Sequence, residues 1–595
     1  MSKDDTTDYS RREFIRTSGL AALGSGLAGA ISTPVSFAQT ENKPAPQKPH
    51  EGPYNILMIV TDQERHMSPG DLPIGYQLPG HERLAKDGIV FENHQVASCV
   101  CTPSRAVMYT GQHIQNNGMF DNTNFPWSGS MSTDIDTVGD LLRKQGYYTA
   151  YKGKWHLTEE FETVNMLQSP KKLLSAEMEE YGFSDYFGIG DIIAHTNGGH
   201  LHDGIISAMS RSWLRGKGEE LREENKPWFM AVNLVNPHDV MYYNTDLPDQ
   251  KEQSGMAMLH INHEPSNTVY QQNWNVTLPD SRSQAIDEPG RPTAHLDYRN
   301  SRGLMVGVVP NDDGRWARLN NYYLNCIQDV DNSILEILNE LDDLGIADNT
   351  IVIFTADHGE LAGAHGLNGK GATAYREQNN VPFTIVHPAY QGNKRCKAVT
   401  SHVDIATTLV SMAGGRSESV PGLPGKDISR LLGNPEAAPT NALRDGALYN
   451  YNMFAYIDQA FFASVGAFFA AGGKPEGLAR QGFKPNLKKR GAIRSVFDGR
   501  YKLNRYYSPL QHHVPKTLEQ LFANNDLELF DVSNDPSEIN NLAVNKNQYG
   551  EILKMMNDKL NLLIEQEVGD DVGQMLPSIK GTDWKLSLSI WDLRL

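Results

Sequence analysis

The chain has 595 residues, with 54 Lys and Arg against 72 Asp and Glu, which gives a formal net charge of −18. This length allows several structural units with a buried core, and a hydrophobic content of 39% is typical of a folded protein. The acid excess argues against a nucleic-acid partner, although a cleft on an acidic protein can be locally basic, and four cysteines exclude a disulfide-built scaffold.

The first residues have the pattern of an export signal. Arg11 and Arg12 are followed by an apolar stretch of small residues from Gly19 to Ile31 and by a small-residue cleavage pattern at 36–38. We therefore expect residues 1–38 to be a twin-arginine signal peptide, which is read by the Tat export machinery and leads to a periplasmic or secreted location. A short amphipathic helix at the N-terminus is the alternative interpretation.

Three continuous apolar runs predict strands that are buried on both faces of a mostly parallel sheet. They cover Asn55–Thr61, Trp228–Val235 and Thr350–Thr355, and each is followed directly by polar residues. The carboxyl ends of such strands are where ligands bind in open α/β sheets. The polar residues that follow the three strands are Asp62, Asn236-Pro237-His238 and Asp357-His358.

A helix is predicted directly before the third strand. Apolar residues recur at spacings of three and four between Ile327 and Leu344, and Gly345 follows as a C-cap. A helix that leads into a buried strand is an α/β unit, so we expect an α/β fold whose central sheet is flanked by helices.

Residues 240–315 lose this periodicity and are rich in Asn, Asp, Pro and Gly. Loops of this length are usually functional or disordered. Several aromatic residues favour an ordered loop near a binding site. They are Tyr242, Tyr243, Tyr270 and Trp274.

The chain changes character after about residue 400. Helical stretches appear at 403–414 and 550–565, whereas Arg500–Leu503 and Leu527–Phe530 resemble short strands of a small antiparallel sheet. The apolar segment Phe454–Ala471 contains Asp458 and Gln459, so we expect a buried or interface helix there rather than a membrane anchor.

The sharpest motif is Cys101-Thr102-Pro103-Ser104-Arg105, followed by Thr110-Gly111. At these residues the chain resembles the type I, formylglycine-dependent sulfatases of the alkaline phosphatase superfamily. The resemblance runs from about residue 54 to 545 and implies an alkaline-phosphatase-like large domain. Further matching segments are Gly146–Thr149, Gly153-Lys154-Trp155-His156, Asn236-Pro237-His238, Ala356-Asp357-His358-Gly359-Glu360 and Lys370.

The resemblance also gives the expected domains. After the signal peptide, we expect a linker at 39–53, a catalytic sulfatase domain at 54–435 with a substrate-loop insertion at 240–315, and a smaller C-terminal α+β subdomain at 436–595.

Asp62 and Asp357 are hard oxygen ligands at predicted strand ends, and with Gln63 and His358 they form a candidate site for a divalent cation. Oxygen-rich coordination favours Ca²⁺, with Mg²⁺ or Mn²⁺ as alternatives. Either aspartate alone would be better explained as a helix N-cap.

Cys101 is a poor partner for a hard cation, because a soft thiolate prefers soft metals. The resemblance implies that a formylglycine-generating enzyme oxidises Cys101 to formylglycine, whose hydrated gem-diol offers hard oxygens. It further implies that one diol oxygen attacks sulfur and that the second expels sulfate. A small buried cysteine is the alternative.

The transferred sulfuryl group is anionic and needs fixed cations, which Arg105, Lys154 and Lys370 can supply. The resemblance implies that His156 binds the diol. It also makes His238 the favoured proton donor to the leaving alcohol, with Lys370 as the alternative.

Two residues depart from many sulfatases, which have Asp where this chain has Gln63 and Asn where it has His358. This combination also resembles choline-sulfatase-like and phosphonate-monoester-hydrolase-like members. We expect an exported sulfatase that hydrolyses sulfate esters, and the polar, aromatic loop suits a sulfated carbohydrate. Aryl or choline sulfate is a further candidate substrate. The rival functions are a phosphodiesterase or phosphonate monoester hydrolase with the same nucleophile, and a non-catalytic protein that binds sulfated glycans.

Overall fold

The structure is a computed structural model of the whole chain. It describes residues 52–571 apart from 124, 126–127, 159–175, 189–195, 417–419, 421, 474–480, 484 and 512–513. The predicted signal peptide and nearly all of the predicted linker lie outside the described residues. Among the helices that the structure describes, none combines the length and the apolar character of a membrane span.

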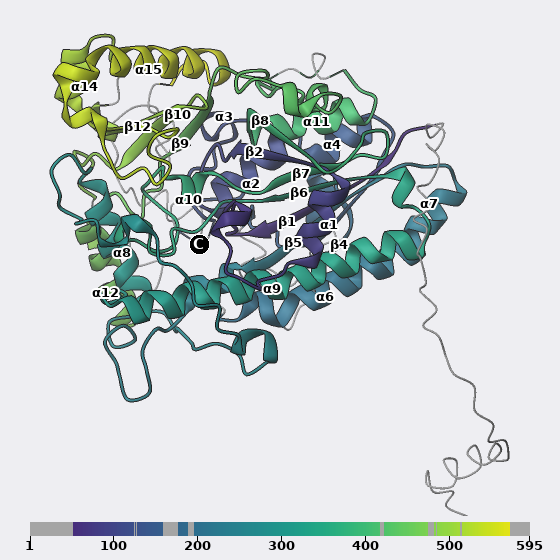
Figure 1. Cartoon of the computed structure of the whole chain (residues 1–595), viewed down its shortest axis with the longest axis horizontal. Helices are drawn as coiled ribbons and strands as arrows, with labels where there is room; N and C mark the ends of the chain where they lie inside the picture. Colours follow the sequence, from purple (N-terminus) through teal and green to yellow (C-terminus); the bar gives the residue numbers. More distant parts are fainter. Residues whose placement is uncertain are drawn as a thin grey trace, which may run out of the picture. The chain divides into compact units, whose positions relative to one another are not determined.

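The centre of the molecule is an eight-stranded sheet with the order β4-β3-β5-β1-β6-β7-β2-β8 (Figure 1). Neighbouring strands are parallel except at β7, which is antiparallel to both β6 and β2. The prediction of a mostly parallel sheet is therefore confirmed. The strands are β1 (Asn55–Asp62), β2 (Ile89–Gln95), β3 (Tyr148–Gly153), β4 (Ser184–Phe187), β5 (Trp228–Pro237), β6 (Thr350–Ala356), β7 (Phe383–Val386) and β8 (Lys394–Ser401).

The three predicted strands are β1, β5 and β6, and they lie side by side with β1 in the middle. Every residue of β1 is buried because its alternate side chains enter two different cores. Met58 and Val60 pack in one core, and Leu57 and Ile59 pack in the other. This explains why the sequence of the strand is apolar throughout rather than alternating.

Helices cover both faces of this sheet (Figure 1). The core that contains Met58 is closed by α2 (Cys101–Thr110), α4 (Val138–Lys144) and α11 (Val403–Met412). The other core is closed by α1 (Pro79–Asp87), α6 (Gly198–Trp213) and α9 (Asp313–Asp343). The shorter helices are α3 (Ile114–Asn117), α7 (Glu219–Glu223) and α10 (Arg376–Asn379).

Helix α9 is longer than the sequence predicts. It begins at Asp313, after the side chain of Asp312 accepts a hydrogen bond from the backbone N–H of Arg315. Its first turns bury Trp316 and Tyr323 against the segment before it. These turns also carry many polar residues, which hides their periodicity in the sequence.

The segment 240–315 is not one irregular loop, because it contains α8 (Ala294–Val306) and short 3₁₀ turns. The buried face of α8 includes Ala294, Tyr298 and Arg302, spaced four residues apart. Two of these three are polar, so the hydrophobic pattern missed a real helix. The predicted order of the segment is confirmed by the burial of Tyr243 and Tyr270.

The predicted antiparallel sheet is also present, with the order β12-β11-β10-β9. It packs against α15, which matches the predicted helix at 550–565, while α12 buries part of the apolar segment after residue 454. The boundary at residue 436 stays a prediction. The elements are β9 (Ala447–Tyr451), α12 (Gln459–Ala470), β10 (Ala492–Phe497), β11 (Tyr501–Tyr507), α14 (Leu518–Asn524), β12 (Asn525–Asp531) and α15 (Lys546–Glu567).

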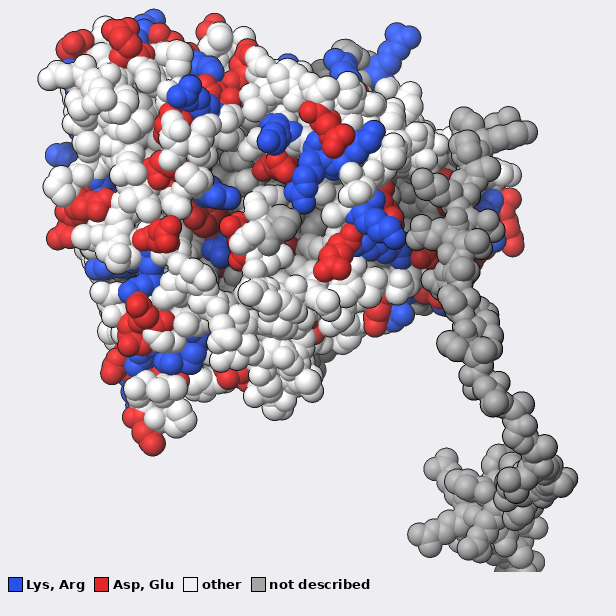
Figure 2. All heavy atoms as spheres, viewed as in Figure 1, with Lys and Arg blue, Asp and Glu red and all other residues white. Residues whose placement is uncertain are grey.

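On the face shown in Figure 2, basic and acidic side chains are interspersed among neutral ones. The negative net charge of the sequence is therefore not gathered into one continuous acidic surface on the described part of this face.

Candidate active site

The predicted site residues gather at the carboxyl edge of the large sheet. The four adjacent strands β3, β5, β1 and β6 all run in the same direction, so the residues that follow them meet at one edge. Helix α2 begins at this edge with Cys101. The strand-end residues brought there are Asp62, Gln63, Lys154, His156, His238, Asp357 and His358.

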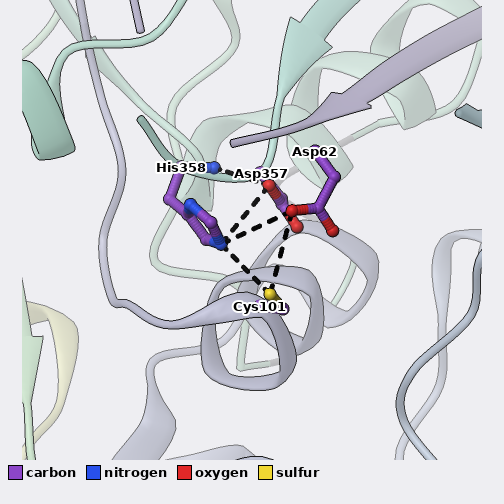
Figure 3. A group of neighbouring side chains, drawn as sticks. All are labelled: Asp62, Cys101, Asp357 and His358. Atoms are coloured by element: carbon purple, nitrogen blue, oxygen red, sulfur yellow. Dashed lines mark hydrogen bonds and ion pairs between the residues drawn. The ribbon is translucent and has the colours of Figure 1, made fainter. Parts of the chain in front are cut away.

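Four side chains form the centre of the site, namely Asp62, Cys101, Asp357 and His358 (Figure 3). Their ligand atoms lie within 4.8 Å of one another, and all four residues are buried. Nε2 of His358 is 3.2 Å from Sγ of Cys101, 3.8 Å from Oδ1 of Asp62 and 3.6 Å from Oδ1 of Asp357. The first turn of α2 thus places residue 101 against ligands from two neighbouring strands.

Arg105 connects the two carboxylates of this cluster. It lies one turn after Cys101 on α2 and is fully buried. Its Nε donates to Oδ2 of Asp357 at 2.9 Å, and its Nη2 donates to Oδ2 of Asp62 at 3.2 Å. The other oxygen of each carboxylate is thereby turned toward His358. The structure places Arg105 on the carboxylates, and its predicted contact with sulfate stays a prediction.

The two lysines approach the centre from different segments. Nζ of Lys154 lies 2.8 Å from Oδ2 of Asp62. Nζ of Lys370 donates to Oε1 of Gln63 and lies 3.6 Å from Sδ of Met241. Both ammonium groups are nearly buried, so they are fixed charges rather than solvated surface lysines.

The two predicted histidines follow β5 and β3 at the same edge of the sheet. His238 interacts with Cys101 and begins the short turn after β5, where its ring meets Tyr242 edge to face at 5.9 Å. His156 is buried, and its backbone oxygen accepts a hydrogen bond from Oγ1 of Thr102 at 2.8 Å. That bond ties the turn after β3 to the first turn of α2.

Burial and neighbouring charges shift the pKa values of the two aspartates of the site in different directions. Burial alone would raise the pKa of Asp62, but Lys154, His238 and Arg105 lower it well below its usual value. Burial and the charge of Asp62 raise the pKa of Asp357 to about 6.

The same cations act on residue 101. Burial and Asp62 oppose ionisation of the Cys101 thiol, but Lys154, Lys370 and His358 lower its pKa well below the usual value. Burial, Lys370 and Lys154 lower the pKa of His238 to about 3, which favours a neutral imidazole. The position of residue 101 therefore favours negative charge.

Glu360 is part of the site, although the sequence motif gave it no role. Its Oε1 accepts from the backbone N–H groups of Ala362 at 2.9 Å and Gly369 at 2.6 Å, and its Oε2 accepts from Nε2 of Gln63. It therefore fixes the amide of Gln63 with Oε1 toward Lys370. The sequence shows that Glu360 belongs to the motif, but it does not show that Gln63, 297 residues away, is its partner.

Asn233 is a second residue that the sequence did not identify. Its Oδ1 accepts hydrogen bonds from Nη1 of Arg105 at 3.1 Å and from the hydroxyl of Tyr109 at 2.8 Å. A polar residue inside the apolar run of β5 is the signal that could have pointed to it, because buried polar groups in such strands need partners.

The donor set fits a hard divalent cation. Asp62 and Asp357 each turn one carboxylate oxygen toward Nε2 of His358, and oxygen with imidazole ligands suits Ca²⁺, Mg²⁺ or Mn²⁺. The thiol of Cys101 is the one soft donor of the set, and an oxygen at this position would remove the mismatch. Gln63 lies beside the cluster, with its amide oxygen bonded to Lys370.

Comparisons with known proteins agree with this geometry. The family model described as Sulfatase matches residues 54–415, which is more than half of the chain. The chain is 27% identical over 450 residues to an N-acetylglucosamine-6-O-sulfatase of Bacteroides thetaiotaomicron, covering 68% of this chain and 75% of that one. It is 26% identical over 434 residues to an ulvan-active sulfatase of Formosa agariphila, covering 70% of each.

Among solved structures, a phosphonate monoester hydrolase from Silicibacter pomeroyi has a TM-score of 0.60 at 18% identity, covering 87% of this chain and 97% of that one. A likeness at this identity shows a shared fold. The family assignment follows from the matching family model together with the sulfatase relatives. The chain belongs to the sulfatase family of the alkaline phosphatase superfamily and is a sulfuric ester hydrolase.

Proposed function

We propose that this protein is an exported sulfatase that removes sulfate from a glycan, with Cys101 converted to formylglycine. The observation that carries the proposal is the position of residue 101, with Sγ 3.2 Å from His358 and 3.9 Å from Asp62 inside a cluster of metal-ligand type. The relatives named for N-acetylglucosamine and ulvan sulfatase activity support a glycan substrate.

Asp62, Asp357, His358 and the converted residue 101 would hold the divalent cation, with Ca²⁺ as the first candidate and Mg²⁺ or Mn²⁺ as alternatives. Gln63, which lies next to these residues, would be a further ligand of the cation. A bound cation in such a site supplies Lewis acidity, which lowers the pKa of an oxygen nucleophile.

The residues of the chain have separate tasks in this proposal. Lys154 and Lys370 hold the sulfate group between two fixed positive charges, which stabilises the negative charge on its oxygens in the transition state. Arg105 fixes the orientation of the two aspartate carboxylates. His156 orients the hydrated side chain of residue 101.

His238 is our first candidate for the group that delivers a proton to the leaving alcohol, because it lies against residue 101. Its lowered pKa favours the neutral form, so it must receive that proton during turnover. Lys370 is the second candidate, because its Nζ is a hydrogen-bond donor beside the cluster, where it donates to Oε1 of Gln63.

A phosphodiesterase or phosphonate monoester hydrolase activity is the second candidate function. Gln63 and His358 favour it, because they stand where many sulfatases have Asp and Asn, and the fold is shared with a phosphonate monoester hydrolase. A glycan-binding protein without catalysis does not need the cluster around residue 101.

Parallel assays separate these functions. We expect the full chain, matured in a host that forms formylglycine, to release sulfate from aryl sulfate and from N-acetylglucosamine 6-sulfate or ulvan oligosaccharides faster than it cleaves a phosphodiester or a phosphonate monoester. A faster phosphodiester or phosphonate reaction would favour the second function, and retention of sulfated glycan without turnover would favour the third.

The matched control for the nucleophile is Cys99, which is buried two residues earlier and packs in an apolar core. Cys101→Ala should abolish sulfate release, whereas Cys99→Ala should keep it. Equal loss in both variants would contradict the assigned role of Cys101.

The export signal remains part of the proposal. Replacing Arg11 and Arg12 together by Lys should keep the protein in the cytoplasmic fraction, because the twin-arginine pair is the feature that the export machinery reads. Unchanged export of this variant would contradict the assignment.

A further inference from the structure

A cavity of about 380 Å³ lies beside α8, outside the cluster around Cys101. One wall is formed by α8, a second by residues 282–286, and a third by the segment 365–368, which leads to Lys370. This volume is within the range of about 300–1,000 Å³ typical of small-molecule sites. Its lining includes Arg282, Gln284, Arg299, His365 and Asn368.

Arg299 brings an uncompensated positive charge to this cavity. Among the residues that the structure describes, it has no hydrogen-bond acceptor and no ion-pair partner, and its Nε is buried. Burial and the neighbouring Arg291 lower its pKa, while Asp287 acts in the opposite direction without forming an ion pair.

Arg282 on the same cavity differs, because it is bonded to Asp313 and, at 2.7 Å, to Oδ1 of Asn311. A guanidinium group that is half-buried and unpaired favours a bound anion. Arg299 therefore offers the cavity a charge that no described residue neutralises.

His365 is a fixed part of the cavity wall. Its ring is fully buried and stacks on Tyr375 with the ring centroids 3.4 Å apart, and its Nδ1 lies 2.7 Å from Oε1 of Gln284. Because Nε2 is buried as well, Arg299 is the group through which the cavity recognises a ligand.

A short segment of the chain runs from the wall of the cavity to the reaction site. Asn368 lines the cavity two residues before Lys370. Between them, Gly369 packs on Arg302 so closely that a Cβ there would lie 2.5 Å from the Arg302 guanidinium carbon. Nη2 of Arg302 donates to the backbone oxygen of Met241 at 3.2 Å, and Sδ of Met241 is 3.6 Å from Nζ of Lys370.

We propose that this cavity is a subsite for a second, anionic saccharide unit of the substrate. The carboxylate or sulfate of that unit binds the guanidinium group of Arg299. The inference rests on the proposed glycan sulfatase function and makes it more specific, because it requires a substrate with a negative charge beyond the sulfate that is removed.

Binding to the full chain tests this subsite without turnover. In a Cys101→Ala background, glucuronic acid and glucosamine 6-sulfate are titrated as separate probes and followed by NMR. Replacing Arg299 by Gln keeps the length of the side chain and removes its charge. We expect about tenfold weaker binding of at least one probe, because a charge-assisted hydrogen bond is lost. Arg299→Lys should bind with intermediate affinity, since it keeps the charge but not the planar fork.

The matched control is Arg500→Gln, which makes the same change at an exposed arginine directly before β11 that is ion-paired with Asp531. It should leave both affinities unchanged. Weaker binding of glucuronic acid by the Arg299 variant would assign the subsite to a carboxylate, and weaker binding of glucosamine 6-sulfate would assign it to a second sulfate. Unchanged affinity for both probes in the two Arg299 variants would overturn the proposal.

A kinetic arm separates this inference from the proposed function. In protein that keeps Cys101 and converts it to formylglycine, Arg299→Gln should raise KM for a sulfated disaccharide that carries a second anionic group. The same substitution should leave hydrolysis of an aryl sulfate unchanged. Equal loss with both substrates would show that Arg299 only supports the reaction site, and the subsite would be wrong. If the fully matured protein without any substitution hydrolyses no sulfate ester at all, the proposed function fails instead, while the binding result still stands.

Discussion

The large and the small sheet both bury charged residues, but they pair them differently. At the edge of the large sheet, Asp62 is shared between Arg105 and Lys154, and Arg105 is shared between Asp62 and Asp357. Beside the small sheet, Arg494 forms its ion pair with Asp571, and Lys502 forms one with Glu538. Shared charges form a network in which one change disturbs several groups, whereas a local pair affects mainly its own surroundings.

This difference predicts that substitutions at the two sheets separate activity from stability. Changes at the edge of the large sheet should reduce turnover strongly in a protein that still folds. Changes among the buried pairs of the C-terminal region should lower the free energy of unfolding and leave turnover of the folded protein intact.

The largest effect is expected for Asp357→Asn. The substitution removes a carboxylate that Arg105 holds and that faces His358, so both the metal site and the network lose charge. We expect kcat/KM for a sulfate ester to fall about a hundred- to a thousandfold, in the range known for loss of a major electrostatic contact in an active site. Elemental analysis should show a parallel loss of bound divalent metal. Full metal content with full activity would contradict the assignment of Asp357.

A smaller effect on turnover is expected for Glu360→Gln. The new amide presents N–H groups to Gln63, so the amide of Gln63 turns and no longer directs its oxygen toward Lys370. We expect kcat to fall about 10- to 100-fold, as for other residues that orient ligands, and the affinity of the apoprotein for Ca²⁺ to fall with it.

An exchange of the two groups sharpens this prediction. In the double variant Gln63→Glu with Glu360→Gln, the hydrogen bond between the two side chains is restored, and an oxygen again faces Lys370. We expect partial recovery of both kcat and Ca²⁺ affinity. The matched control is Glu528→Gln near the small sheet, where Glu528 accepts from Asn504 and Tyr506. That variant should change the unfolding midpoint and leave kcat unchanged.

For the C-terminal region, Arg494→Met is the sharpest test of stability. Arg494 is fully buried and its Nε lies 2.7 Å from Oδ2 of Asp571, so its removal leaves a buried carboxylate without this cation. We expect the free energy of unfolding to fall by about 3–5 kcal/mol, as for other broken buried ion pairs. Urea denaturation measures this loss. A large fall in kcat without a loss of stability would contradict the separation of the two regions.

The smallest effect is expected from a single carboxylate in the segment 240–315. Burial alone would raise the pKa of Asp246, but hydrogen bonds from Ser254, Gln253 and Arg315 lower it below its usual value. The stability that the ionised Asp246 contributes is present above the pKa of the unfolded chain, and it is lost as the pH falls from about 4 toward the lower pKa of the folded protein.

Asp246→Asn should therefore lower the free energy of unfolding at pH 7 by about 1–2 kcal/mol and make its decrease in acid less steep. Urea unfolding at a series of pH values measures both. An unchanged acid dependence in this variant would mean that Asp246 does not contribute to it.

Three adjacent strands of the large sheet, β1, β5 and β6, could be predicted because their residues are apolar on both faces, which leaves a continuous apolar run in the sequence. Helix α8 could not, because its buried face carries Tyr298 and Arg302, and pattern reading depends on apolar residues. The centre of the site followed from the motif that begins at Cys101. The partners of that motif, such as Glu360 with Gln63, depend on contacts between segments far apart in the chain, which a single sequence does not record.

The most direct test of the account is the chemical state of residue 101 in fully matured, active protein. Mass spectrometry of the peptide that spans Cys101 should show a loss of about 18 Da, the change from a thiol to the aldehyde that is hydrated to the nucleophile. The rate of sulfate release should rise in proportion to the converted fraction across preparations. Full sulfatase activity in a preparation that carries only an unmodified thiol at this position would contradict the account.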